Sequence, residues 1–399
     1  MKVKAINRSE EGCTRERAQD VQKVHRNLDP ALHPFEKAKE YTRALNAAKL
    51  DRVFAKPFLA ALPHDDGITC LARNPRRLNS LLSGAADGDV RLWDIPARRC
   101  LRRMVGHTAA IKGISVTPDG EAAVSCSTDC TVKLWKVPFA PFDGGPLQED
   151  SQPVLEFSGR HAFRSVDHHW GRAQFATAGA AVEVWDHERS EPVQTFSWGA
   201  DTLTSVRFNP AEPDVFATAG SDRGVALYDL RSSTPIRKLV MQTRTNALAW
   251  NPMEAFNFTV RIFTFNGGHS RDVYHTKRMQ RVFAVRFSGD GTYVFSGSDD
   301  MNVRVWKANA SEQLGTLLPR ERKQLQYNKA LVERHKHLPE VARVVRNRHL
   351  PAPIYKAAKL RRVQQDSERR KTQHRIAHSA PGSVKVKPAR RKKVVAELE

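Results

Sequence analysis

The sequence predicts an all-β domain made of a strand repeat, with a basic and largely helical extension at each end. Three observations support this prediction. A pattern of alternating apolar residues recurs along the middle of the chain, positive charge is concentrated toward both ends, and prolines divide the C-terminal part into helical segments. With 399 residues and 40% hydrophobic content, the chain is long enough to bury a large core.

Composition excludes several classes of protein. No apolar run approaches the roughly 18 residues of a membrane-spanning helix, and the first residues lack the apolar segment of a secretory signal. The cysteines are odd in number and lack the spacing of a disulfide scaffold, which favours a reducing compartment, cytosol or nucleus. They are Cys13, Cys70, Cys100, Cys126 and Cys130.

Five segments in the middle of the chain align with one another. Each has small residues, a turn, and then alternating apolar residues that end in an aromatic side chain. The segments are SGAADGDVRLWD (83–94), SCSTDCTVKLWK (125–136), TAGAAVEVWD (177–186), TAGSDRGVALYD (218–229) and SGSDDMNVRVWK (296–307). The first three intervals between the aromatics are 42, 50 and 43 residues. Alternation predicts strands, and this repeat length is typical of the four-stranded blades of a β-propeller.

The repeat resembles that of WD-repeat proteins, since Gly106-His107, Trp93-Asp94 and Trp185-Asp186 supply the dipeptides typical of that family. The resemblance implies that an Asp six residues before the aromatic bonds a His from the start of the blade and links a Ser or Thr to the Trp. His107, Ser125, Asp129 and Trp135 make the full set in the second unit. The corresponding residues elsewhere are Asp87 with Trp93, Asp222, and Asp300 with Trp306. Gly179 replaces the Asp in the third unit, which we expect to be less rigid.

Catalysis and metal binding are disfavoured. A Ser, His and Asp set that recurs with the repeat indicates structure rather than a catalytic triad, and the motifs of phosphate loops, zinc proteases and serine hydrolases are absent. Cys126 and Cys130 have irregular spacing for zinc and no second pair. His168 and His169 of the DHHW stretch (167–170) face opposite ways on a strand. We therefore expect no enzyme activity, no catalytic residue, no cofactor and no bound metal.

Positive charge is concentrated at the two ends. The net charge of +22 divides into +5 over residues 1–63, +2 over 64–307 and +15 over 308–399. Such asymmetry favours a polyanionic partner such as RNA or a ribonucleoprotein. The alternative is a solvated charged helix with a targeting signal.

Each extension contains helical patterns. In the N-terminal one, a helix from about Phe35 to Leu50 would align Phe35, Ala38, Tyr41, Leu45 and Ala48. In the C-terminal one, Pro339 suits the first turn of a helix that carries Val341, Val344 and Val345 and that Pro351 and Pro353 end.

An Arg-rich helix is predicted from about Ile354 to Arg375, followed by a disordered tail with a basic cluster similar to nuclear-import signals. A helix this basic is suited to RNA phosphates or acidic protein. The candidate contact residues for RNA or a particle are Arg361, Arg362, Arg369, Arg370, Arg390, Arg391, Lys392 and Lys393.

The flanking motifs are more specific than the repeats. They are NLDPALHPFE, AKPFLA, DHHW, WGADTLTSVRFNP, RTNALAWNPMEAFNFT, YHTKRMQRVF, KANASEQLG, RHLPAPIYKAAKLRR and HSAPGSV. Nearly end to end, they resemble the Sof-type WD-repeat proteins, also described as the DDB-one- and cullin-four-associated factor thirteen family. The resemblance implies a nuclear, nucleolar protein of the small-subunit processome that associates with the U-three small nucleolar ribonucleoprotein and acts in 18S ribosomal RNA processing. It also implies, as an alternative, a partner in the DDB-one/cullin-four ubiquitin ligase, for which the chain would be a substrate receptor.

A ligase adaptor would be recognised through an aromatic-Asp-x-Arg motif at the end of a third strand. Tyr228, Asp229 and Arg231 fit this pattern, whereas Trp93-Asp94 lacks the Arg and Trp185-Asp186 has Arg189 one residue late. The alternative is that Arg231 is an ordinary surface residue.

One repeat is too short. Pro252 and Phe263 are 11 residues apart, whereas Pro210 and Tyr228 are 18 apart. We expect second-strand residues 256–259 to run into a third strand at 260–265 without the residues a hairpin needs. The resemblance implies seven blades, so we predict that a blade's worth of sequence is missing between Thr259 and Val260. About six blades would remain, one of them a hybrid. The expected organisation is an N-terminal extension (1–63), a β-propeller (64–307) and a basic helical domain with a tail (308–399).

Overall fold

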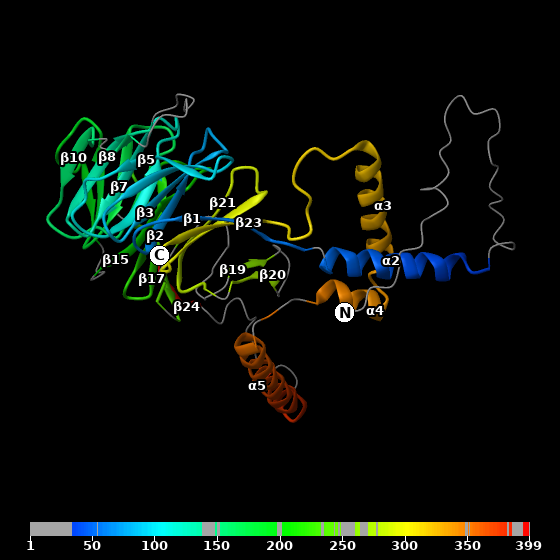
Figure 1. Cartoon of the computed structure of the whole chain (residues 1–399). Coiled ribbons are helices and arrows are strands. Elements are labelled where there is room, and N and C mark those ends of the chain that lie inside the picture. Colours follow the sequence, from blue (N-terminus) through cyan, green and yellow to red (C-terminus); the bar gives the residue numbers. More distant parts are fainter. Residues whose placement is uncertain are drawn as a thin grey trace. The chain divides into compact units, whose positions relative to one another are not determined.

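The computed structural model describes most of the chain. The described residues are 34–53, 55–137, 148–149, 152–197, 202–232, 235–242, 244–245, 248, 260–263, 270–276, 278–347, 350, 352–380, 383–384 and 394–398. Their contacts define two compact units, one of the described residues within 34–57 and 309–347 and one of those within 58–308 and 350–398; Figure 1 labels their helices and strands.

Four blades of the second unit follow one another along the chain as antiparallel sheets in sequential strand order. Blade 1 consists of β2 (Ile68–Arg73), β3 (Ser80–Ala85), β4 (Val90–Asp94) and β5 (Arg99–Met104), with β9 (Gln148–Glu149) added in parallel to β5. Blade 2 consists of β6 (Ile111–Val116), β7 (Ala122–Ser127), β8 (Thr131–Lys136) and β10 (Leu155–Ser158). Blade 3 consists of β11 (Ser165–His168), β12 (Gln174–Ala178), β13 (Val182–Asp186) and β14 (Gln194–Phe196). Blade 4 consists of β15 (Leu203–Phe208), β16 (Val215–Gly220), β17 (Gly224–Asp229) and β18 (Pro235–Met241), with β24 (Val394–Leu398) as a fifth strand.

A fifth sheet joins the two ends of the repeat region. This terminal blade combines β21 (Val282–Phe287), β22 (Tyr293–Ser298) and β23 (Asn302–Lys307) with β1 (Phe58–Pro63). Strand β1 runs antiparallel to β23, with Phe58 opposite Trp306 and Pro63 opposite Asn302. The segment Phe58–Pro63, expected in the N-terminal extension, therefore lies inside the sheet region.

The hydrophobic core lies between neighbouring blades. The first strands lie side by side in the order β21, β2, β6, β11 and β15. Alternating apolar side chains of adjacent sheets meet there, and they bury Trp135, Trp185 and Trp306 completely, each at 1% exposure or less. Burial on this scale is the main favourable contribution to the stability of the blades. The prediction of repeated four-stranded β units is confirmed.

Between blade 4 and the terminal blade, the chain forms a smaller sheet. Strand β19 (Val260–Phe263) pairs with β20 (Ser270–Tyr274), and no further strand joins them among the described residues. Tyr274 stacks on Trp306, with ring centroids 5.6 Å apart, so this sheet packs on the terminal blade. The strand predicted at 260–265 is confirmed for Val260–Phe263, whereas Thr259 and the strand predicted at 256–259 lie outside the described residues.

The other unit is helical and is assembled from both ends of the chain. Helix α2 (Glu36–Val53) packs against α3 (Pro319–His335) and α4 (Pro339–Arg346). Its centre is formed by Ala44, Ala48, Leu331 and Val341, all at 4% exposure or less. At the rim, the Tyr41 hydroxyl donates to Glu340 Oε2 at 2.6 Å. Residues from 1–63 and 308–399, treated separately in the sequence, therefore share one core.

Helix positions agree with the sequence in part. The helix expected from Phe35 is confirmed as α2, but of the five residues expected on its apolar stripe only Ala48 is buried, and Phe35 and Ala38 are exposed. Pro339 begins α4, as predicted. Pro353 lies in the first turn of α5 (Ala352–Ala377), so the expectation that it ends the preceding helix is wrong, because the first turn of a helix tolerates proline.

Among the described helices, none combines the length and apolar character that crossing a membrane requires.

The C-terminal tail is partly ordered. Residues Val394–Leu398 form β24 along the edge of blade 4, so the prediction of a disordered tail is wrong for these residues. The basic cluster just before them, Arg390, Arg391, Lys392 and Lys393, lies outside the described residues.

Candidate functional site

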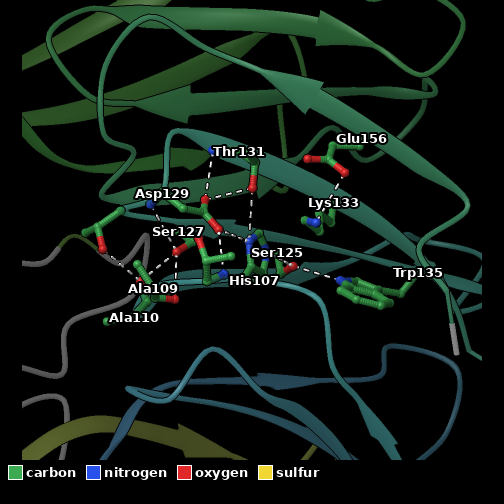
Figure 2. A network of polar contacts seen from close by, with 12 residues as sticks. His107, Ala109, Ala110, Ser125, Ser127, Asp129, Thr131, Lys133, Trp135 and Glu156 are labelled. Carbon is green, nitrogen blue, oxygen red and sulfur yellow. Dashed lines mark hydrogen bonds and ion pairs between the residues drawn. The ribbon is translucent and has the colours of Figure 1, made fainter. Parts of the chain in front are cut away.

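Blade 2 contains a buried polar network, shown in Figure 2. His107 precedes β6, Ser125 lies in β7, Asp129 lies in the turn after β7, and Trp135 lies in β8. The Trp135 indole donates to Ser125 Oγ at 2.7 Å, His107 Nε2 lies 2.8 Å from the same oxygen, and His107 Nδ1 lies 2.9 Å from Asp129 Oδ2. Thr131 donates its backbone N–H and its hydroxyl to Asp129 Oδ1 at 2.9 and 2.7 Å.

These contacts determine where the protons lie. Ser125 Oγ accepts from the indole and donates to His107 Nε2, so the imidazole proton is on Nδ1 and points at Asp129. Burial lowers the pKa of His107, which favours the neutral ring. Burial alone would raise the pKa of Asp129, but hydrogen bonds from Thr131 and His107 hold it below the ordinary value. Ser125 is 0% exposed, so its hydroxyl cannot meet a substrate, and the network holds the blade together instead.

The corresponding aspartates have other partners. Asp87 Oδ1 accepts the backbone N–H of Asp89 at 3.0 Å, and burial raises the pKa of Asp87. Asp222 binds Lys238 Nζ at 2.7 Å, and Asp300 binds both terminal nitrogens of Arg304. The structure therefore brings the full set together in blade 2, whereas a basic side chain from the same sheet occupies the place of the His in blade 4 and the terminal blade.

Blade 1 contains a histidine that the sequence reasoning missed. His64 Nε2 lies 2.7 Å from Ser83 Oγ, which also accepts the Trp93 indole at 2.8 Å. His64 precedes Ser83 by 19 residues and His107 precedes Ser125 by 18, so spacing alone could have identified it. The residue before His64 is Pro63 rather than the Gly of the expected dipeptide, which conceals the match.

The link between a hydroxyl and an indole extends to the remaining tryptophan blades. Trp306 donates to Ser296 at 2.8 Å across 10 residues, and Trp185 donates to Thr177 at 2.9 Å across 8. The shorter spacing in blade 3 reflects its tighter turn at Gly179, where an aspartate would otherwise stand.

In four sheets, the turn after the second strand places one residue in the left-handed region of backbone conformation. Gly88, Cys130, Arg223 and Met301 follow the turn aspartates and have φ of 93°, 65°, 65° and 61°. Only glycine adopts this conformation without steric cost. A Cβ added at Gly88 would also lie 2.4 Å from the carbonyl oxygen of His107.

The DHHW stretch (167–170) links three blades. Asp167 Oδ1 accepts from Ser115 on β6 at 3.2 Å and from Arg207 on β15 at 3.1 Å, and Asp167 Oδ2 accepts the Phe208 backbone N–H at 2.8 Å. One carboxylate on β11 therefore joins the first strands of blades 2, 3 and 4.

The two histidines of this stretch have separate partners, but β11 ends at His168, so the expectation that both lie on one strand is wrong. His168 Nδ1 donates to the His169 carbonyl at 2.6 Å, so His168 Nε2 accepts from His187 Nε2 at 3.1 Å. His169 Nδ1 accepts from the backbone N–H groups of Gly171 and Arg172, and its Nε2 lies 3.6 Å from Asp214 Oδ1. Burial lowers the pKa of His168 to about 4.

The candidate adaptor motif ends β17. Tyr228 is buried at 3% exposure and belongs to the core between blades 3 and 4. Asp229 Oδ1 accepts the backbone N–H of Arg231 at 3.0 Å. The Arg231 side chain is 73% exposed and contacts Asp214, which also lies 3.3 Å from Arg172. Within this motif, Arg231 is the side chain most open to a partner.

The predicted RNA-contact residues on α5 lie on an exposed helix. Arg361, Arg362, Arg369 and Arg370 are all exposed, and so are the apolar Leu360 and Val363, at 61% and 56%. An exposed helix with this many guanidinium groups suits a phosphate backbone.

In the described part of the chain, one group of acidic side chains has the spacing of metal ligands, and no cysteine belongs to such a group. Cys126 is fully buried, and burial raises the pKa of its thiol. Asp65, Asp87 and Asp89 hold oxygens within 4.8 Å of one another. However, Arg91 binds Asp65, and Arg103 binds Asp89 at 2.5 Å, so two of the three carboxylates are already paired with arginines.

Comparison with known proteins covers both parts of the chain. Residues 57–94, 98–136 and 260–307 match the WD domain (G-beta repeat), and residues 308–394 match the Sof1-like domain. The chain is 42% identical over 450 residues to DDB1- and CUL4-associated factor 13 of Xenopus laevis and 41% identical to that of Homo sapiens, with both chains fully covered. It is 38% identical over 440 residues to Protein SOF1 of Saccharomyces cerevisiae, covering 93% of this chain and 90% of that protein.

These alignments are longer than the chain itself. Since the chain has 399 residues and the alignment with the Xenopus laevis protein spans 450, at least 51 positions of that alignment have no counterpart here. Both the WD repeats and the helical C-terminal part are nevertheless present and similar over the full length. The chain therefore belongs to the Sof1-like family of WD-repeat proteins.

Proposed function

We propose that this chain is a non-catalytic scaffold of the small-subunit processome, associated with the U-three small nucleolar ribonucleoprotein and needed for 18S ribosomal RNA processing in the nucleolus. The observation that carries the proposal is similarity along the whole chain to the yeast Protein SOF1, in the WD repeats and in the Sof1-like domain alike. The buried, fully bonded Ser–His–Asp network supports a scaffold rather than an enzyme.

Helix α5 supplies the contact with RNA in this proposal. Residues 308–399 carry a net charge of +15, and the arginines of α5 point to solvent rather than into a core. Binding to a polyanion releases condensed counterions, so the affinity depends steeply on salt.

Sedimentation tests the proposal directly. The tagged chain is expected to travel with large pre-ribosomal particles in a gradient, and RNase treatment before the gradient should move it to lighter fractions. Crosslinking of bound RNA should recover peptides from α5. Migration as a small, RNase-insensitive complex would reject the proposal.

A second candidate function is substrate recognition for a cullin-four ubiquitin ligase. The vertebrate relatives are named for association with DDB1 and CUL4, and here Arg231 is exposed at the end of the Tyr228–Arg231 motif. A ligase receptor should co-purify with the adaptor whether or not RNA is present. RNase treatment therefore separates the two functions.

We also propose that the chain is a repeat-deleted form of its family, with six units where relatives have seven and the join between Thr259 and Val260. The alignment positions without a counterpart here number at least 51 in total, which is close to one repeat, and the unit that contains β19 has two described strands where the blades have four. A ring of blades closes only when their wedge angles match, so loss of a repeat strains the closure. Insertion of the corresponding segment from a relative is expected to raise the melting temperature. An equal melting temperature would reject the strain.

A further inference from the structure

The outer edge of blade 4 is covered by the end of the chain. Strand β24 runs antiparallel to β18, with Lys238 opposite Leu398, Val240 opposite Ala396 and Met241 opposite Val394. The partners are more than 150 residues apart in the sequence, so the contact is a docking event rather than a local hairpin.

Strand β18 is the longest of the described outer strands. It has 7 residues, whereas the described outer strands β1, β5, β10, β14 and β20 have 3 to 6. A long unpaired edge presents a row of backbone donors and acceptors to which other strands can bind. Charged side chains on an edge discourage such pairing. On β18, Arg237 is exposed, whereas Lys238 is held by Asp222 and its side chain is 16% exposed. Ile236 on the same strand is 49% exposed.

The backbone ladder, rather than apolar burial, holds β24 in place. Val395 is 69% exposed and Leu398 is 49% exposed, so neither side chain contributes much burial. The register shifts between Val240 and Met241, and Val395 has no partner across this bulge. Backbone hydrogen bonds give affinity for any extended segment, whereas side-chain pockets give specificity. This contact therefore has the character of a reversible strand addition.

We propose that the outer edge of blade 4, along β18, is a docking site for an extended strand, and that the C-terminal segment Val394–Leu398 of the same chain is its resident ligand. In the sequence, residues 378–393 separate α5 from β24, and they include the basic cluster that ends at Lys393. Attachment to the same chain gives such a segment an effective concentration on the order of millimolar. An identical strand added in trans therefore displaces it only at concentrations in that range.

The test uses the full-length chain with Val395→Pro and Ala396→Pro. Consecutive residues of a strand point their N–H groups to opposite sides, so two adjacent prolines remove a donor toward β18 in either register. Val395→Thr with Ala396→Ser is the matched control, because it changes the same positions and keeps both donors. Amide hydrogen exchange of those residues within 236–241 whose N–H groups point toward β24 is expected to quicken at least tenfold in the proline variant and to stay at the wild-type rate in the control. Exchange of β17 should stay slow in both variants. Equal protection of these β24-facing N–H groups in the proline variant and the wild type would overturn the proposal.

A second measurement identifies the ligand. A labelled peptide of residues 391–399 is expected to bind the proline variant, as followed by fluorescence anisotropy, and to need at least a tenfold higher concentration to bind the wild-type chain. The same peptide with both prolines should not bind. If both peptides bind the proline variant equally, attraction of the basic residues explains the binding and the strand-docking site is rejected.

Discussion

Arg231 and Asp214 form an ion pair, with Arg231 Nη2 2.5 Å and Nε 3.0 Å from the same carboxylate oxygen. Hydrogen bonding from Arg231 lowers the pKa of Asp214. Any acidic group of an adaptor would have to compete with this internal carboxylate for the guanidinium.

If Arg231 contacts a ligase adaptor, its replacement should weaken adaptor binding without unfolding the blade. Arg231→Ala should reduce capture of the adaptor by at least about tenfold and leave the melting temperature unchanged, because the ion pair is exposed and contributes little to stability. Arg172→Ala is the control, since Arg172 contacts the same carboxylate but lies outside the motif. Equal pull-down by the Arg231→Ala variant and the wild type would remove the motif from consideration.

The buried hydroxyls should differ in their contribution to stability. Ser83 and Ser125 each bind an indole and an imidazole, whereas the described contacts of Ser296 include the Trp306 indole but no histidine. Replacement by Ala leaves buried partners unsatisfied at about 1–3 kcal/mol each. We expect Ser83→Ala and Ser125→Ala to lower the free energy of unfolding by about 2–4 kcal/mol and Ser296→Ala by about half as much, measured by urea denaturation. Equal losses at all three sites would contradict this account.

Stability should fall in mild acid. Burial lowers the pKa of both His64 and His168 to about 4, from 6.5 in the unfolded chain. As the pH falls from 6.5 toward 4, these two histidines bind protons in the unfolded chain but stay neutral in the folded chain. The free energy of unfolding therefore decreases. Above pH 6.5 the two histidines do not lower the free energy of unfolding. Below it the loss grows progressively, to on the order of 3 kcal/mol for each histidine at most.

Replacing these histidines should flatten the pH dependence. Urea denaturation of His168→Gln between pH 7.5 and pH 5 is expected to show a smaller decrease than the wild type. His161→Gln, at an exposed position, serves as the control and should keep the wild-type slope. Parallel slopes for wild type and His168→Gln would show that His168 is not responsible.

Substitutions at two of the left-handed turn positions should change stability in opposite directions. Gly88→Ala places a Cβ 2.4 Å from the His107 carbonyl in addition to the unfavourable φ, so we expect a loss of at least about 2 kcal/mol. Met301→Gly relieves a φ of 61° and should be neutral or stabilising by up to about 1 kcal/mol, since the relief exceeds the entropic cost of glycine. Thermal unfolding of both variants, with Gly291→Ala as a positive-φ control in open space, checks the difference.

The basic helix should determine the salt dependence of RNA binding. Neutralising Arg361, Arg362, Arg369 and Arg370 to Gln is expected to lower the slope of log K against log salt by up to about 3, at about 0.7 for each phosphate contact on a single strand. The matched control removes four charges from exposed positions of the helical unit, at Arg322, Lys323, Lys329 and Lys336. An unchanged slope in the α5 variant, or an equal change in the control, would contradict a specific role for α5.

Local pattern is sufficient to predict the blades. Period-two alternation and a recurring aromatic are properties of neighbouring residues, so the sequence alone places Trp93, Trp135, Trp185, Tyr228 and Trp306 in strands. The partner of each turn aspartate is harder to predict. A lysine on the next strand, Lys238, takes the place of a histidine beside Asp222, and only the folded sheet brings the two together.

Long-range pairing is invisible in the sequence. Nothing in FLAALP (58–63) indicates that it completes the sheet of β23, and nothing in VVAEL (394–398) distinguishes a docked strand from a tail. Similarly, α2 buries Ala44 against helices that follow the repeats, although alanine on a helix predicts no particular partner. Such contacts depend on which surfaces the finished fold leaves open.

The contacts between N-terminal and C-terminal elements affect how the chain folds during its synthesis. Strand β1 can pair only after β23 has been synthesised, and helix α2 can pack only after α3 and α4 have been synthesised. The Tyr41–Glu340 contact, for example, joins residues 299 positions apart. At about 5–20 residues per second, a ribosome needs on the order of tens of seconds to deliver these partners. During that time the first-made strand and helix have unpaired backbone and uncovered apolar faces. The nascent chain is therefore a substrate for chaperones that bind early segments, and its contact order makes folding slow after release.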